Sequence, residues 1–183
     1  MTDYFYTGMP FVMRKENDGQ PYHLTQGDPG GATSWGVTFA TWITWQRLHR
    51  EPATLEAFKV QTQTDMYPIY RALYWNANRC GNMGPFGISV FDVSVMSGPA
   101  RGAKILQTLL GVEVDGQIGP LTIAAFNQVP DQLQLNKDYY DARIVFYQSL
   151  KGVSQFLHGW TRRADDCKTL VDSLLQTDAP ETT

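Results

Sequence analysis

This sequence has no long apolar run, no excess of positive charge and no residue spacing typical of metal ligands. Each of these absences argues against a class of protein. No stretch approaches the ~20 consecutive apolar residues of a membrane-spanning helix, so we expect no stable membrane insertion. The formal net charge is -3 and no basic stripe is visible, which argues against nucleic-acid binding. The three histidines are scattered without His/Glu spacing, so we expect neither a catalytic metal nor a cofactor.

Cysteine is also scarce. Cys80 and Cys167 lie far apart in the sequence, and this favours two free thiols. A disulfide between them is the alternative. The first fifteen residues lack a basic segment followed by an apolar stretch, so they do not resemble a conventional signal peptide. We therefore expect a protein made in the cytoplasm that needs another route to any target outside it.

The chain has enough apolar residues for a core, because 43% of its 183 residues are hydrophobic and 13% are aromatic. This length predicts one compact domain, or one domain plus a small appendage. Residues 17–36 hold five of the sixteen glycines and predict a polar loop or small hairpin. Elsewhere apolar residues recur at helical spacing. The helices expected from this spacing cover 39–50, 64–75, 87–96, 100–110, a short segment opened by Pro120, 131–150 and 156–174. The predicted fold class is mainly α, a helical globule with a small β-hairpin near the N-terminus.

Glu16 is a candidate acid. It follows the apolar segment 11–13 and directly precedes the polar loop, which would place it at a helix end facing a cleft. Cleavage of a glycosidic bond needs one acid that protonates the leaving oxygen and a second group that attacks the sugar or holds the attacking water. Taken alone, the local sequence fits an ordinary surface glutamate better.

The segment 28–38 combines an Asp-Pro-Gly-Gly turn with small and hydroxyl residues before Trp35. The turn itself needs only a structural explanation. The small residues that follow it suit a backbone that runs close to a ligand, and Trp35 could stack on a sugar ring. Both interpretations of this segment remain open from the residues alone.

Several motifs in order resemble the glycoside hydrolase family 108 muramidases, which are endolysin-type lysozymes of phages and prophages. The resemblance covers roughly residues 8–165. Its most specific stretches are Asp-Pro-Gly-Gly-Ala-Thr at 28–33 and Asp-Gly-Gln-Ile-Gly-Pro-Leu-Thr at 115–122. The other matching segments are Glu16, 35–38, 70–75, 91–93, 106–111 and 159–163.

The resemblance implies a lysozyme-like core that hydrolyses the bond between N-acetylmuramic acid and N-acetylglucosamine in peptidoglycan. Residue by residue, it implies that Glu16 is the acid, Asp28 the second carboxylate and Thr33 the hydroxyl that helps to position water. Attack by that water opposite Glu16 would invert the anomeric centre. The side chains expected to contact the glycan strand are Tyr22, Trp35, Tyr74, Trp75 and Asp92.

Two departures from the family pattern stand out. The loop between Glu16 and Asp28 is about three residues longer than in the family. The longer loop affects the orientation of Asp28 and leaves Asp18 as an alternative second carboxylate. Met96 stands where the family pattern has an asparagine that would contact the sugar or the cleft wall. This change could alter substrate preference or activity.

Asp92 has two interpretations, because it lies on the apolar stripe of its predicted helix. A buried carboxylate must be paired, and Arg101 or Arg71 would tie it to a neighbouring helix. The alternative is a residue on the floor of a cleft.

The domain organisation expected from the resemblance is a single lysozyme-like domain over 1–183. Residues 8–97 form its catalytic part, and residues 98–176 resemble a peptidoglycan-binding segment. Because no linker flanks the 115–120 turn, we expect a structural corner there, not a separate module. Residues 177–183 are expected to be a tail.

Two other functions compete with hydrolysis. A lytic transglycosylase would use one glutamate and close an anhydro ring, and a non-catalytic protein would only bind the wall. The expected partner is the peptidoglycan glycan strand, and the expected state is a monomer. Such a protein would act in the periplasm or cell wall after release by a holin or a secretion machine.

Overall fold

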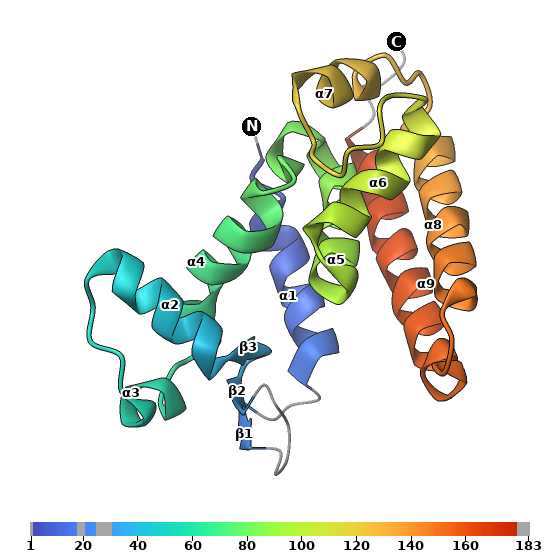
Figure 1. Ribbon diagram of the computed structural model, residues 1–183. Coiled ribbons are helices and arrows are strands. Elements are labelled where there is room, and N and C mark those ends of the chain that lie inside the picture. Colours follow the sequence, from blue (N-terminus) through green and yellow to red (C-terminus); the bar gives the residue numbers. More distant parts are fainter. Residues whose placement is uncertain (1, 18–20, 25–30, 179–183) are drawn as a thin grey trace. The chain divides into compact units, whose positions relative to one another are not determined.

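The computed structural model describes residues 2–17, 21–24 and 31–178, and this part is mainly helical with one small antiparallel sheet (Figure 1). The predicted fold class is confirmed. The chain divides into two compact units, residues 1–6 with 73–183 (unit 1) and residues 7–72 (unit 2). The single-domain organisation expected from the length stays a prediction. No helix in the described ranges is long and apolar enough to cross a membrane.

Unit 2 surrounds a small aromatic core. Its elements are most of α1 (Phe5–Asn17), β1 (Tyr22–Leu24), β2 (Ala32–Ser34), β3 (Val37–Thr38), α2 (Phe39–His49), α3 (Leu55–Lys59) and α4 (Tyr67–Tyr70). Thr38 ends the sheet and caps α2, because its hydroxyl accepts a hydrogen bond from the backbone N–H of Thr41. Phe58 of α3 contacts the rings of Trp42 and Phe39, so the α3 helix, which the sequence did not predict, closes the core.

The helix expected over 64–75 is present in three pieces. A 3₁₀ turn (Thr64–Met66) leads into α4, and a π-helical segment (Arg71–Asn76) follows. Pro68 lies in the first turn of α4, as predicted, where the missing N–H costs little. The π-helical segment shifts side chains away from the 3.6-residue period, which a periodicity analysis does not reveal.

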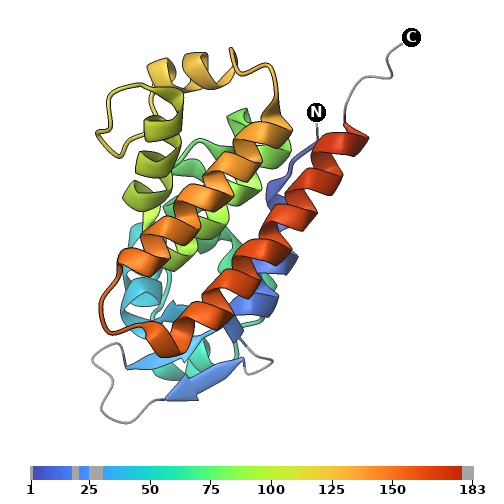
Figure 2. The same ribbon diagram turned by 90° about the vertical axis from the view of Figure 1, so that its right-hand side faces the viewer.

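Unit 1 is built on α5 (Gly87–Ser97), α6 (Pro99–Leu110), α7 (Pro120–Phe126), α8 (Gln132–Ser149) and α9 (Ser154–Thr177). Helices α8 and α9 lie side by side as an antiparallel hairpin (Figures 1 and 2). The predicted end of α6 is confirmed, since Gly111 adopts φ 65° just after the last helical residue. Asp131 caps α8 through a hydrogen bond from the backbone N–H of Gln134.

Helices α5 and α6 approach closely because Gly102 has no side chain. A Cβ atom at Gly102 would lie 2.7 Å from the hydroxyl of Ser94 and 3.0 Å from the carbonyl oxygen of Val90. The same Ser94 hydroxyl accepts a hydrogen bond from the Asn78 amide at 2.7 Å. The Gly102 carbonyl in turn accepts one from Tyr139 of α8, so the contact extends to a third helix.

A buried ion cluster ties α5 to α8 and α9. Asp92 of α5 has no exposed surface, and its carboxylate oxygens lie 2.6 Å from Nη2 of Arg143 and 2.6 Å from Nη2 of Arg163. Arg143 also donates through Nε to the hydroxyl of Tyr147 at 2.7 Å. Burial alone would raise the pKa of Asp92, but the guanidinium groups of Arg163 and Arg143 outweigh it and hold the pKa below its ordinary value.

The two cysteines are free thiols, as the sequence favoured, and both are buried. Burial raises the pKa of the Cys167 thiol to about 12, and it also raises the pKa of Cys80. Both side chains therefore act as small apolar residues in unit 1.

Replacement of Asp92 by asparagine should strongly destabilise the protein, because it removes the carboxylate to which two buried guanidinium groups donate. Breaking a buried pair in this way typically costs about 3–5 kcal/mol. Urea unfolding followed by circular dichroism measures the loss. The control is Asp141→Asn, which removes an exposed pair with Lys137 and should cost far less. Equal losses in the two variants would contradict the role of the cluster.

The stability of the parent should also fall in acid. Because the folded-state pKa of Asp92 lies below its unfolded value of about 3.9, the cluster stabilises the fold fully above that pH. The contribution is lost as the pH falls through the folded-state pKa. Unfolding free energies measured between pH 6 and pH 2 should drop more steeply for the parent than for Asp92→Asn. Parallel profiles would show that another carboxylate controls acid unfolding.

Candidate functional site

The predicted acid lies at the end of a helix. Glu16 is the second-last residue of α1, which agrees with the expected helix end, and the preceding segment 11–13 is buried. The side chain of Glu16 and all of Asp18 and Asp28 lie outside the described residues. Their roles as acid and second carboxylate therefore stay predictions.

Thr33 lies at the centre of the small sheet. Strand β2 pairs with β1 on one side and β3 on the other, and Thr33 stands opposite His23 and Thr38. Ala32 and Ser34 are buried, and Thr33 between them is half-buried. This pattern is expected because successive side chains of a strand point to opposite faces of the sheet. The Thr33 hydroxyl is thus on the more open face of the sheet, beside His23, which is exposed and which the sequence analysis did not single out.

Trp35 occupies an unusual backbone conformation at the turn between β2 and β3. Trp35 and Gly36 form a two-residue connection with φ 48° and φ 77°. Positive φ at both positions is the signature of a type I′ hairpin turn, which normally carries Asn, Asp or Gly. A bulky residue in this region is strained by about 1–3 kcal/mol.

Three hydrogen bonds hold Trp35 in this conformation. Its backbone N–H donates to the carbonyl of Pro21 at 2.7 Å, and its carbonyl accepts from the hydroxyl of Tyr70 at 3.0 Å. Its indole N–H donates to the carbonyl of Gln61 at 2.9 Å. At a net value of about 1 kcal/mol each, these bonds offset the strain. Since every polar group of Trp35 is engaged, its half-buried indole can offer a ligand only its ring surface.

The other predicted sugar contacts divide into two groups. Tyr22 is half-buried beside Phe58, and Tyr74 is half-buried in the π-helical segment, so both retain some exposed surface. Trp75 is only 2% exposed and packs against other rings of unit 1, and Asp92 is not exposed at all. Neither of these two side chains presents surface to a sugar, so their assignment as substrate contacts does not fit the structure.

Asp92 follows the structural interpretation instead. The expectation of an arginine partner is confirmed, but the choice of Arg101 or Arg71 was wrong, since Arg143 and Arg163 pair with it. Both true partners come from helices more than fifty residues away in sequence. The sequence showed that a partner was needed and carried no signal for which arginine supplied it.

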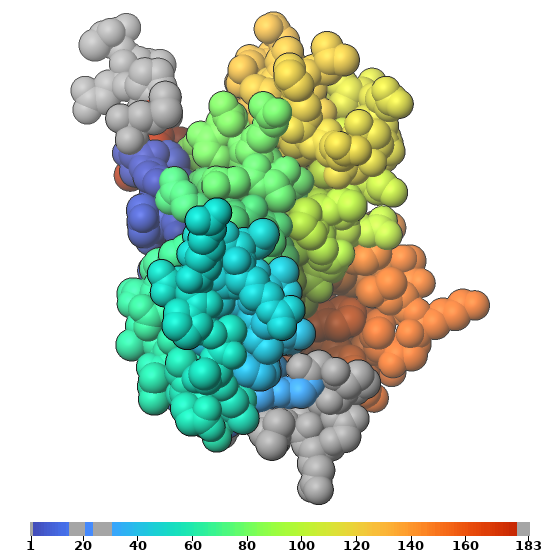
Figure 3. Space-filling model, turned by 60° about the vertical axis from the view of Figure 1, so that its left-hand side comes forward, coloured from blue at the N-terminus to red at the C-terminus, as the bar shows by residue number. Residues whose placement is uncertain are grey.

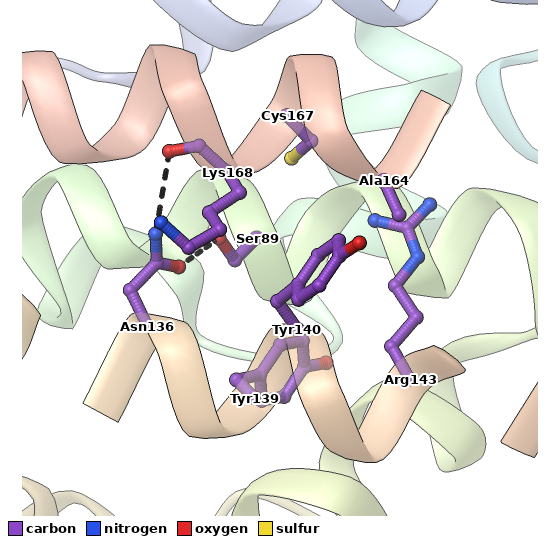
Figure 4. Close-up of a pocket in the computed structure, with 8 residues that line it drawn as sticks. All are labelled: Ser89, Asn136, Tyr139, Tyr140, Arg143, Ala164, Cys167 and Lys168. Carbon is purple, nitrogen blue, oxygen red and sulfur yellow. Dashed lines mark hydrogen bonds between the residues drawn. The ribbon is translucent and has the colours of Figure 1, made fainter. Parts of the chain in front are cut away.

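The cavity in the α5–α8–α9 interior is too small for a sugar. It has a volume of about 10 Å³, room for a single water molecule, and Figure 4 shows Ser89, Asn136 and Arg143 among its lining residues. The Ser89 hydroxyl donates to the Asn136 side chain at 2.6 Å, which joins α5 to α8. Among the described residues, no three His, Cys, Asp or Glu side chains are placed to share a metal ion.

A wider hollow of about 400 Å³ lies at the start of α8 in unit 1. Its two carboxylates are already engaged: Asp131 caps α8, and Asp178 accepts a hydrogen bond from Tyr4. Among the described residues that line it, the hollow therefore offers no free pair of carboxylates for acid and base chemistry.

The Asp-Gly-Gln-Ile-Gly-Pro motif forms a corner organised by Gln107. The buried amide of Gln107 donates to the Asp115 carboxylate at 2.7 Å and to the Gln117 carbonyl at 3.0 Å. Its oxygen accepts from the backbone N–H of Gly116, which adopts φ 81°. The expected structural corner is present, and sequence analysis missed Gln107 as the residue that holds it.

Two family models match the chain in succession. The model described as Glycosyl hydrolase 108 matches residues 9–98, and the one described as Predicted Peptidoglycan domain matches residues 101–165. The solved structure of Brucella abortus SagA is 31% identical, covers 96% of this chain and 98% of its own, and superposes with a TM-score of 0.78. No curated protein matches the chain.

These matches define the class of the protein as a glycoside hydrolase with peptidoglycan as its substrate. The chain belongs to the glycosyl hydrolase 108 family. The first match contains Glu16, Asp28, Thr33 and Trp35, so all the residues predicted to act on the bond lie in the hydrolase segment.

Replacement of Tyr70 by phenylalanine should lower the free energy of unfolding by about 1 kcal/mol, because it removes the hydrogen bond to the strained Trp35 carbonyl. The Trp35 backbone should then exchange its amide hydrogen faster. Hydrogen exchange and urea unfolding measure the two effects. Tyr22→Phe in the same unit is the control and should change neither. Unaltered exchange at Trp35 in Tyr70→Phe would show that the other two bonds hold the turn alone.

Proposed function

We propose that the protein is an N-acetylmuramidase that hydrolyses the bond between N-acetylmuramic acid and N-acetylglucosamine. The observation that carries the proposal is the family match over 9–98, which brings the end of α1 and the β2–β3 hairpin into one hydrolase segment. Glu16 comes from the helix end, and Thr33 from the open face of the hairpin. A helix end and a small sheet are rigid supports for two groups that must face one bond.

In the proposed reaction the carboxylic acid of Glu16 protonates the glycosidic oxygen, and the bond to the anomeric carbon breaks. A water molecule attacks that carbon and gives a proton to the Asp28 carboxylate. The Thr33 hydroxyl positions this water by accepting a hydrogen bond from it or donating one to it. One proton enters the leaving sugar and one leaves the water, so charge and atoms balance. Attack from the side opposite the acid inverts the anomeric centre.

Trp35 and Tyr22 supply the proposed sugar contacts. Trp35 has only its ring surface to offer, which suits stacking on the apolar face of a pyranose ring. Tyr22 lies on β1 opposite Ser34, next to the His23–Thr33 pair. Tyr74 is kept as a further contact because part of its surface is open.

Replacement of Glu16 by glutamine should reduce clearing of a purified wall suspension by at least about a hundredfold, because the amide cannot protonate the leaving oxygen. Turbidity loss measures the rate, and circular dichroism checks the fold. Asp28→Asn and Thr33→Val should also lose most activity, whereas Thr33→Ser, which keeps the hydroxyl, should retain it. Glu51→Gln changes an exposed glutamate of unit 2 and should clear like the parent.

The products distinguish the competing functions. Mass analysis of the released muropeptides should find reducing ends, and anhydro ends would instead show a lytic transglycosylase. Wild-type protein that sediments with walls without clearing them would indicate a non-catalytic wall-binding protein. Clearing by Glu16→Gln at the parent rate would show that another residue is the acid.

The place of action follows from the substrate. Peptidoglycan lies outside the cytoplasmic membrane, so the proposed enzyme works in the periplasm or cell wall. A phage-type lysis role would use a holin for release, and wall remodelling would use a secretion machine. We propose that it acts as a monomer.

A further inference from the structure

The open face of the small sheet carries a histidine beside Thr33. Strand β2 lies between β1 and β3 (Figure 1), and His23 of β1 stands directly opposite Thr33 while Thr38 of β3 stands opposite it on the other side. Directly opposite residues of an antiparallel pair point to the same face, with Cβ atoms about 4.5–5.5 Å apart. Thr33 therefore has two side-chain neighbours across the strands, His23 and Thr38.

Only one of these two neighbours is free to act on a ligand. The Thr38 hydroxyl accepts a hydrogen bond from the backbone N–H of Thr41 at 3.2 Å and lies 2.9 Å from the Thr41 hydroxyl, so the cap of α2 engages it. Among the residues that the structure describes, the side chains of His23 and Thr33 make no hydrogen bond or ion pair. The open face thus presents one imidazole and one hydroxyl side by side, both available to a ligand.

The attacking water of the proposed hydrolysis can bond in four directions, through two O–H groups and two lone pairs. In the proposed reaction one lone pair attacks the anomeric carbon and one O–H group donates to Asp28. The Thr33 hydroxyl can donate to the second lone pair. The second O–H group is then left for an acceptor, and an ordered water typically makes about three hydrogen bonds. An unprotonated imidazole nitrogen is such an acceptor.

We infer that His23 is this acceptor, so that His23 and Thr33 hold the attacking water between them. The inference rests on the proposed function, because it takes the water and the role of Thr33 from it. His23 removes no proton in this role. It fixes the direction of the second O–H group, which aims the first at the base and the lone pair at the carbon. Two adjacent strands suit this task, since their register fixes both backbone positions.

The sheet itself does not need a histidine at this position. His23 is exposed, and an exposed strand residue contributes mainly through contacts with its cross-strand neighbours. The imidazole has no hydrogen-bond or ring partner in the part of the chain that the structure describes. Its removal should therefore cost little stability, and a loss of rate would report on the reaction.

The test measures kcat and KM on a soluble glycan of alternating N-acetylglucosamine and N-acetylmuramic acid. His23→Phe keeps a planar ring but removes both nitrogens, and it should lower kcat about tenfold to hundredfold, the effect of one lost hydrogen bond, with KM within about twofold. His23→Gln provides an amide oxygen as acceptor and should retain most of the parent's kcat. Circular dichroism and urea unfolding confirm that each variant is folded.

A double variant tests whether the two side chains hold the same water. His23→Phe in a Thr33→Val background should lower kcat far less than it does in the parent, because Thr33→Val has already released the water. Independent roles would instead give losses that multiply, and this outcome would overturn the inference.

His49→Gln is the matched control. His49 is also an exposed histidine of unit 2, but its Nδ1 lies 2.8 Å from the Trp45 carbonyl oxygen and its ring lies 4.1 Å from the Trp45 ring. It belongs to α2, which forms part of the surface of unit 2 (cyan in Figure 3), and its replacement should leave kcat and KM unchanged.

Two further outcomes would count against His23. A parent-like kcat in His23→Phe overturns the inference, and so does a raised KM at unchanged kcat, which would make His23 a sugar contact. Both leave the proposed hydrolysis intact. A parent protein that does not cleave the glycan contradicts the proposed function, and the inference with it, so the two failures are distinguishable.

Discussion

The Asp92 carboxylate is the contact on which the arrangement of unit 1 depends. One buried carboxylate accepts hydrogen bonds from two guanidinium groups, and movement of α8 or α9 away from α5 would break one of these ion pairs. Hydrophobic burial is non-directional, so it specifies the register of α8 and α9 against α5 less sharply than an ion pair does. Directional bonds to both carboxylate oxygens define one register among the three helices. Tyr147 is held in the same register, because its hydroxyl accepts a hydrogen bond from Arg143.

Unit 2 obtains rigidity in a different way. Its sheet is only three short strands, which would be marginal on their own. The strained turn at Trp35 is held by bonds from three separated segments, at Pro21, Gln61 and Tyr70. Strain that is compensated from several directions gives a side chain that does not adjust when a ligand arrives. In the proposed role of Trp35, a fixed ring surface would lose little entropy on binding a sugar.

Much of the fold could be predicted from the sequence because its signals are local. Gly111, Pro120 and the apolar stripes of α8 and α9 each determine structure within a few residues. The π-helical segment after Pro68 and the short α3 depend on packing, so no local sequence pattern predicted them. The same distinction explains Asp92. Its position on an apolar stripe predicted a buried carboxylate, while its partners depend on which helices meet in space.

The candidate site shows the corresponding limit for function. Motif order indicated Glu16, Asp28 and Thr33 because each residue type matches a family position, and Thr33 is on the open face of its strand. Trp75 was expected to contact sugar for the same reason. An aromatic side chain within a family motif is equally suited to a core, and Trp75 packs against Phe5 and Phe91. Residue type alone cannot separate a stacking platform from a core ring, since both uses exploit the same apolar surface.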